Sequence, residues 1–161
     1  NQEYLDAARH GLRYLREGGE HDVETVVLWL GHTTAEVTQI TEAYRPDQVA
    51  AFDRFHISSE AMRAVMAHLR KIRAKIVAQV HSHPREAFHS AADDEWAIIR
   101  HAGAHSLVVP NFAEDTTLNN FFDQVAAYEL SADDRWMHIE LRTDLKLGKP
   151  WVTASTKIFA R

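Results

Sequence analysis

The stretch Val80-His81-Ser82-His83-Pro84, continued by FHSAADD at residues 88–94, is the part around which this chain is organised. Its two histidines follow an apolar run, and side chains two residues apart project to the same side of an extended segment. Pro84 ends that segment, because proline has no backbone N–H to offer a sheet. Residues 76–80 are therefore predicted to form a central strand that presents both histidines at its end.

A carboxylate follows the two histidines at the start of a predicted helix. Ser90-x-x-Asp93 is the pattern of a helix capping box, with the serine as N-cap. Two histidines and one carboxylate also form a ligand set suited to zinc, with a fourth position left for water. Such an open set is typical of catalytic zinc, because a structural zinc is normally closed by a fourth protein ligand. The sequence therefore predicts Zn²⁺ held by His81, His83 and Asp93.

In this order, the histidine pair, the proline, the serine and the aspartate resemble the JAMM motif of the JAB-domain, or MPN-plus, metalloproteases. That family consists of zinc isopeptidases, many of which remove ubiquitin or ubiquitin-like proteins. The likeness covers roughly residues 23–99 and, weakly, the strands that follow. It implies a JAB/MPN-like fold and a metalloprotease activity.

One spacing departs from the family pattern. A count from the second histidine selects Asp94 as the metal ligand, whereas a count from the serine selects Asp93. We prefer Asp93, because the loop after Pro84 can lose a residue, while helix geometry sets the offset from serine to aspartate. Asp94 stays an alternative.

The resemblance also implies a general base. The family carries this glutamate at the start of its first strand, seven residues before a glycine that closes the strand. Glu24 stands at that distance from Gly31, in a predicted strand at residues 23–31 whose aliphatic content indicates burial on both faces. Glu20 and Glu36 are the other candidates, although neither has that position, and a glutamate at a strand end is ordinarily a solvated charge.

The chemistry that the resemblance implies assigns a role to each residue. Zinc lowers the pKa of its bound water toward about 7 and polarises the scissile carbonyl. Glu24 takes the proton of that water and passes it to the leaving amine. Ser90, besides being an N-cap, corresponds to the family serine that hydrogen-bonds water or the developing oxyanion. His89 is expected to be exposed.

Periodicity and turn signals predict the other elements of the chain. They are a helix at 2–17, a strand at 36–44, a loop at 47–54, a short strand at 55–57, a helix at 58–74, a helix at 90–102, a strand at 105–109, a connection at 111–123 and a hairpin of 125–130 with 135–141. This order indicates an α/β (α+β) sandwich with a mixed, largely antiparallel β-sheet flanked by helices. We expect a single domain over residues 1–161, with an uncertain tail from about 143.

Composition excludes several classes of function. The formal net charge is −5 and no run of lysine and arginine offers a track for phosphates, so nucleic acid is not a predicted partner. No apolar run approaches the roughly 20 residues of a membrane span, so no membrane partner is predicted. The absence of cysteine excludes disulfides, a thiol nucleophile and Cys-ligated zinc, and it is compatible with a cytoplasmic protein.

The expected substrate follows from the resemblance alone. Family peptidases cut after the C-terminal tail of a ubiquitin-like protein laid along the site as an added strand, here between walls predicted at 45–55 and 111–123. The compact chain resembles the stand-alone JAB peptidases of prokaryotes, which implies E1-like and E2-like partners in a bacterial conjugation system, with antiphage defence as one setting. Two alternatives remain open: a non-catalytic MPN-type scaffold, and a JAB hydrolase acting on a sulfur-carrier protein or a small amide.

Overall fold

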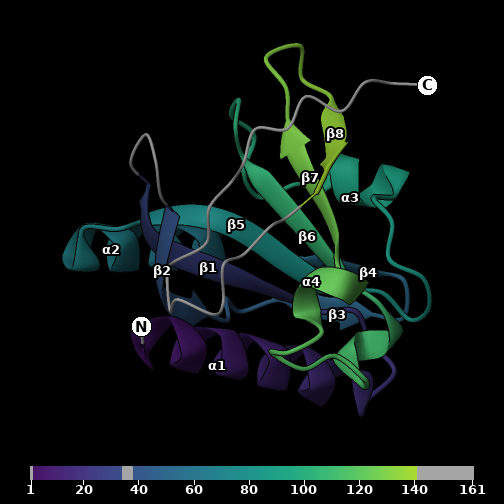
Figure 1. The fold of residues 1–161 in the computed structure, drawn as a ribbon. Helices are drawn as coiled ribbons and strands as arrows, with labels where there is room; N and C mark the ends of the chain where they lie inside the picture. The colour runs from purple at the N-terminus through teal and green to yellow at the C-terminus, as the bar shows by residue number, and fades with distance from the viewer. Residues whose placement is uncertain (1, 34–37, 141–161) are drawn as a thin grey trace.

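The computed structural model describes residues 2–33 and 38–140 (Figure 1). The elements are α1 (Gln2–Gly19), β1 (Val26–Thr33), β2 (Thr38–Tyr44), β3 (Val49–Ala51), β4 (Arg54–His56), α2 (Ser59–Ile72), β5 (Lys75–Ser82), α3 (Ala91–Glu95), β6 (His105–Val109), the 3₁₀ turn η1 (Asn111–Ala113), α4 (Phe121–Gln124), β7 (Ala126–Leu130) and β8 (Trp136–Ile139). The predicted segment from about 143 and Glu36 lie outside the described residues.

One six-stranded sheet forms the centre of the molecule. Its strand order is β2-β1-β5-β6-β7-β8, and β3 and β4 form a separate two-stranded ribbon. Only β5 and β6 run parallel within this described sheet, whereas every other neighbouring pair is antiparallel. The predicted mixed, largely antiparallel sheet flanked by helices is therefore confirmed.

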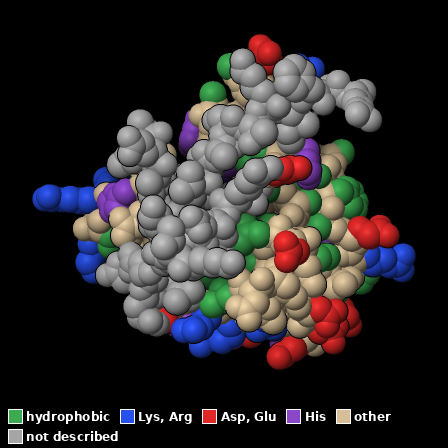
Figure 2. Space-filling view, in the orientation of Figure 1, with side chains coloured by type: hydrophobic (Ala, Val, Ile, Leu, Met, Phe, Trp, Pro, Cys, Tyr) green, Lys and Arg blue, Asp and Glu red, His purple; other side chains and the backbone are tan. Residues whose placement is uncertain are grey.

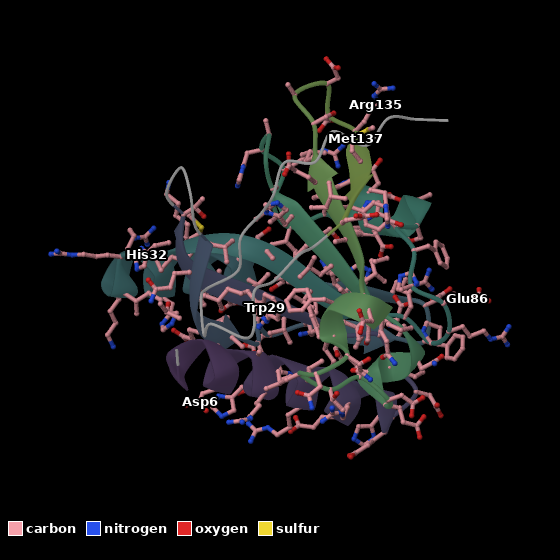
Figure 3. All side chains as sticks on the ribbon, in the orientation of Figure 1. Asp6, Trp29, His32, Glu86, Arg135 and Met137 are labelled. Carbon is pink, nitrogen blue, oxygen red and sulfur yellow. The ribbon has the colours of Figure 1, made fainter. Side chains whose placement is uncertain are left out.

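Helices cover both faces of β1, and the alternation of its side chains explains why. Val27 and Trp29 pack into the core on the α1 side, against helix residues that include Leu12 and Leu15. Figure 3 shows Trp29 between the sheet and α1. Val26, Leu28 and Leu30 point the other way, into the core that α2 closes with Val65 and Leu69. The prediction that this strand is buried on both faces is confirmed.

The antiparallel register of β1 and β5 brings two distant parts of the sequence together. Val26 lies opposite His81, and beyond this pair the Ser82 N–H donates to the Thr25 carbonyl at 3.1 Å. One residue further, Glu24 and His83 become neighbours. This register therefore determines which glutamate reaches the end of β5.

Two predicted boundaries are wrong. The helix expected at 90–102 ends at Glu95, because the Ile98 N–H donates instead to Oε1 of the fully buried Gln79 side chain at 2.9 Å. The loop expected at 47–54 contains β3, which pairs with β4 through a tight turn at Phe52 and Asp53.

No helix among the described residues is long and apolar enough to cross a membrane.

Candidate metal centre

The end of β5 fixes the two motif histidines. His81 lies in the middle of the sheet, opposite Val26 of β1 and Val108 of β6. His83 follows the end of the strand, but its backbone is held on both sides: its N–H donates to the Val109 carbonyl at 2.9 Å, and its carbonyl accepts from the Phe112 N–H at 2.8 Å. The two rings lie with their centroids 5.1 Å apart.

The start of α3 fixes the carboxylate. The Asp93 N–H donates to the Ser90 hydroxyl at 3.1 Å, and the Ser90 N–H donates to Asp93 Oδ2 at 2.6 Å. These reciprocal bonds form the predicted capping box, which is thereby confirmed. Because the box holds one carboxylate oxygen, it also orients the aspartate toward the end of β5.

The three side chains converge. Asp93 Oδ1 lies 3.0 Å from His81 Nε2, and Asp93 Oδ2 lies 3.3 Å from His83 Nε2. All three are buried, and one ligand atom from each lies within 4.8 Å of the others. In the part of the chain that the structure describes, this is the one group of His, Asp or Glu residues arranged to hold a metal ion.

The residues present fit a metal. His81 is completely buried, yet neither of its ring nitrogens has an aligned hydrogen-bond partner, even though Nε2 is close to Asp93. A buried imidazole normally has such a partner, so a metal would complete an otherwise unsatisfied group. Two imidazoles and one carboxylate are the donors of an open divalent-metal site.

The charges of the site also favour a cation. Burial alone would raise the pKa of Asp93, but the nearby His81 and His83 rings outweigh this effect and hold the pKa well below its ordinary value. Burial lowers the pKa of His83, whereas the Asp93 hydrogen bond and Glu24 raise it, and the net shift is upward. Without a metal, a proton on His83 is therefore favoured beside the buried carboxylate.

The structure distinguishes the two neighbouring aspartates by position. Asp94 points away from the histidines and accepts a hydrogen bond from Arg100 Nη1 at 2.9 Å, with a side chain that is 51% exposed. Arg100 also contacts Asp134 at 2.9 Å. Asp93, and not Asp94, is thus the aspartate that the fold brings to His81 and His83.

Glu24 lies beside this triad. Its side chain is buried, its Oε1 is 3.9 Å from His83 Nε2, and its N–H donates to the Ala51 carbonyl of β3 at 2.7 Å. Burial raises the pKa of the Glu24 carboxyl to about 7, although the nearby His83 acts in the opposite direction. Glu20 lines a different pocket with Arg16 and Phe112, and Glu36 is not among the described residues.

Comparison with known proteins agrees with this geometry. The profile of a family described as prokaryotic homologs of the JAB domain matches residues 7–122. The chain belongs to this family. A relative from Sinorhizobium fredii, named Probable metalloprotease y4jG, is 34% identical over 130 residues, which are 78% of this chain and 78% of that protein. The family membership inferred from the JAMM motif is therefore confirmed.

Solved structures show the same fold. A protein from Desulfitobacterium hafniense matches with a TM-score of 0.64 and 15% identity, over 84% of this chain and 86% of the other. A protein from Salinibacter ruber matches with a TM-score of 0.52 and 21% identity, over 83% and 88%. At these identities the likeness concerns the fold, and the chemistry rests on the side chains described above.

A groove of about 630 Å³ leads to the metal centre of this JAB domain. One wall is the turn between β3 and β4, where Phe52 is 55% exposed, and this agrees with the wall predicted at 45–55. The other wall is not 111–123, as predicted, but the loop between β5 and α3, which carries the exposed Phe88. Glu86 marks this loop in Figure 3. Phe112 lies behind Phe52, with ring centroids 6.2 Å apart.

His89 was predicted to be exposed, and this prediction is wrong. Its two ring nitrogens are inaccessible to solvent and have no hydrogen-bond partner. The ring lies near those of Tyr128 and Trp136, with centroid separations of 5.2 and 4.9 Å, and burial lowers its pKa. His89, in the loop just before α3, therefore packs against the β7–β8 hairpin.

Sequence reasoning placed Phe52 and Asp53 in a wall segment without naming them as groove residues, and it missed Phe88. A signal for the first two exists: Val49-Ala-Ala and Arg-Phe-His56 are short segments of strand-like length separated by a two-residue turn. Phe88 carries no comparable local signal, since a lone aromatic residue in a loop is as often packed as exposed.

Proposed function

We propose that this JAB-domain protein is a zinc-dependent peptidase that cleaves after the C-terminal tail of a ubiquitin-like protein, as an isopeptidase or a maturation enzyme. The observation that carries the proposal is the position of the buried Glu24 carboxyl, 3.9 Å from a histidine of the candidate metal triad and at the inner end of an open groove. The name of the 34% identical relative, Probable metalloprotease y4jG, supports the class of reaction.

His81, His83 and Asp93 would hold the zinc, and Zn²⁺ suits this donor set with a fourth position free. When bound, zinc would supply Lewis-acid chemistry, which acidifies water and polarises a carbonyl. Ser90 orients the ligand set, because its backbone N–H binds Asp93 Oδ2. A cation at this centre would lower the pKa of the neighbouring carboxylates.

Glu24 is the proton-transfer group in this proposal. Burial raises the pKa of its carboxyl to about 7 in the metal-free fold, so its carboxylate is a stronger base than a solvated glutamate. It could accept a proton from water and then, as an acid, donate it to the leaving amine. The Ser90 hydroxyl oxygen already accepts the Asp93 N–H, so its own proton remains available to a water or to a developing oxyanion. Both residues act from fixed backbone positions, which reduces reorganisation during the reaction.

The groove suits an extended polypeptide. Phe52 and Phe88 stand exposed in the two walls, and Glu24, His83 and Ser90 also line the groove. A tail with small residues next to the scissile bond could pass between the two rings, and its backbone could add to a strand edge. Conjugating E1-like and E2-like enzymes of a bacterial system, including an antiphage system, are the partners that this proposal implies, in the cytoplasm.

The test is cleavage of a ubiquitin-like protein fused at its C-terminus to a reporter peptide. Zinc-loaded wild type should release the reporter at the junction, as read by intact mass, whereas His81→Ala/His83→Ala should not. Release of a small amide but not of any ubiquitin-like fusion would instead support the small-substrate hydrolase. Stoichiometric zinc without hydrolysis of either substrate would support the scaffold.

A further inference from the structure

A second groove lies at the other end of β5, where α2 turns into that strand. It has a volume of about 410 Å³. We call it the basic groove and define it by an apolar floor and a cationic rim: Leu69, Ile76 and Ile99 below, and Arg70, Arg73 and Lys75 around. Met66, on its side along α2, is 46% exposed. No Asp or Glu of the described chain lines this groove.

The cations at this groove have no ionic partner among residues 2–33 and 38–140. Arg70, Arg73 and Lys75 are exposed, and none takes part in an ion pair within the described residues. On α1, by contrast, Arg9 and Arg13 lie 3.3 and 3.5 Å from carboxylates. Figure 2 shows Lys and Arg side chains at the α2 edge of the molecule, on the left, and Asp and Glu side chains gathered at the lower right.

A cluster of three cations around one groove is unusual for a chain of net charge −5. The end of a helix favours cations because of the helix dipole, which accounts for Arg70 in the last turn of α2. The dipole does not account for Lys75, which belongs to β5, or for an open apolar floor between the cations. An apolar patch rimmed by charge is the form of a protein-binding site.

We propose that the basic groove docks an acidic segment of a partner protein, with apolar side chains on the floor and carboxylates at the rim. The opposite charge of rim and segment would guide the encounter, and burial of the floor would provide the affinity. This function goes beyond the proposed hydrolysis, because the groove lies at the start of β5 and the metal ligands lie at its end.

Other occupants fit less well. Residues 141–161 of this chain carry five Lys or Arg and one Asp, so they have the same sign as the rim. A second copy that presented its own α2 would also be repelled. Nucleic acid would satisfy the cations but would leave the floor of Leu69, Ile76 and Ile99 without apolar partners.

Binding of a synthetic probe tests the proposal on the full chain. The probe is a fluorescein-labelled amphipathic peptide with leucine at i, i+3, i+4 and i+7 and glutamate elsewhere. Fluorescence anisotropy should show saturable binding, and Arg70→Glu/Lys75→Glu should weaken it at least about ten-fold. Met66→Ser should weaken it without a change of charge. Arg73 is left unchanged, because it is the left-handed C-cap of α2 (φ 56°).

The matched control is Arg9→Glu/Arg13→Glu on α1, which makes the same charge change at exposed positions. It should bind the peptide as the wild type does, and thermal unfolding should show that all variants fold. Equal affinity of the groove variants and the wild type, or no saturable binding at all, would overturn the proposal. So would equal binding of a scrambled peptide or tighter binding of oligothymidylate. A wild-type dimer that Arg70→Glu/Lys75→Glu dissociates in sedimentation would make a second copy the occupant instead.

Discussion

Replacing Glu24 with glutamine should separate three properties of the metal centre: folding, metal binding and turnover. Glu24 is buried, so glutamine, which keeps the volume of the side chain, is a better probe than alanine. The variant should still bind zinc, because the three ligand side chains are unchanged. Turnover of a ubiquitin-like fusion should fall by roughly 10²–10⁴-fold, the usual contribution of a positioned general base.

The same substitution should stabilise the metal-free fold. Burial raises the pKa of Glu24 from its ordinary value of 4.5 to about 7. The folded state therefore binds a proton more tightly than the unfolded state, and wild-type stability falls as pH rises from about 4.5 to about 7. That difference in pKa corresponds to about 3 kcal/mol above pH 7. Because glutamine does not ionise, the gain of Glu24→Gln should grow from under about 1 kcal/mol at pH 5 to about 3 kcal/mol at pH 8.

Urea unfolding of chelator-treated protein at about pH 5 and about pH 8 measures the gain in the free energy of unfolding. Kinetics on zinc-loaded protein, with the zinc content measured in the same samples, give the turnover. Glu20→Gln is the matched control, and it should leave turnover within a few-fold. A rate within a few-fold of wild type for Glu24→Gln would exclude Glu24 as the base, and loss of zinc would make it a ligand. A gain in stability that does not depend on pH would refute the argument from burial.

Further predictions concern the ligands and the buried histidine. His81→Ala should abolish zinc binding as measured by elemental analysis, whereas His101→Ala, at an exposed position, should retain about one zinc per chain. Asp93→Asn should lower zinc affinity more than Asp94→Asn, and the opposite order in a competition titration would favour the count from the second histidine. His89→Phe should keep the ring contacts and lower the free energy of unfolding, measured in urea, by under about 1 kcal/mol. His89→Ala should lower it by about 2 kcal/mol or more, because the ring contacts are lost. Equal losses for the two variants would mean that the ring nitrogens have a hydrogen-bond partner.

The sequence predicted the parts of the molecule that depend on local patterns. Apolar runs with β-branched residues identified the strands of the main sheet, and the spacing of His81, His83, Ser90 and Asp93 identified the candidate ligand group that the structure brings together. The choice between Asp93 and Asp94 was made from helix geometry, and the structure has the same capping box. The fold class and the family could be predicted for the same reason.

What could not be predicted depends on long-range contacts. The helix after Ser90 has helical periodicity to about residue 102, but it ends at Glu95 because Gln79, a side chain on β5, takes the Ile98 N–H. His89 has the sequence pattern of a polar loop residue, and its ring is half-buried because it packs against the β7–β8 hairpin. The position of Glu24 next to His83 requires the register between β1 and β5, which no single segment encodes.

β5 separates the basic groove from the candidate metal centre by the length of one strand. Its eight residues measure about 23 Å along the strand, with the basic groove at one end and the candidate metal ligands at the other. A polypeptide that occupied both places at once would need at least about seven extended residues between its acidic segment and its scissile bond. A polypeptide with a shorter spacer could engage either end but not both, so under the proposed function the length of a tail, independently of its sequence, would affect which substrates are cut.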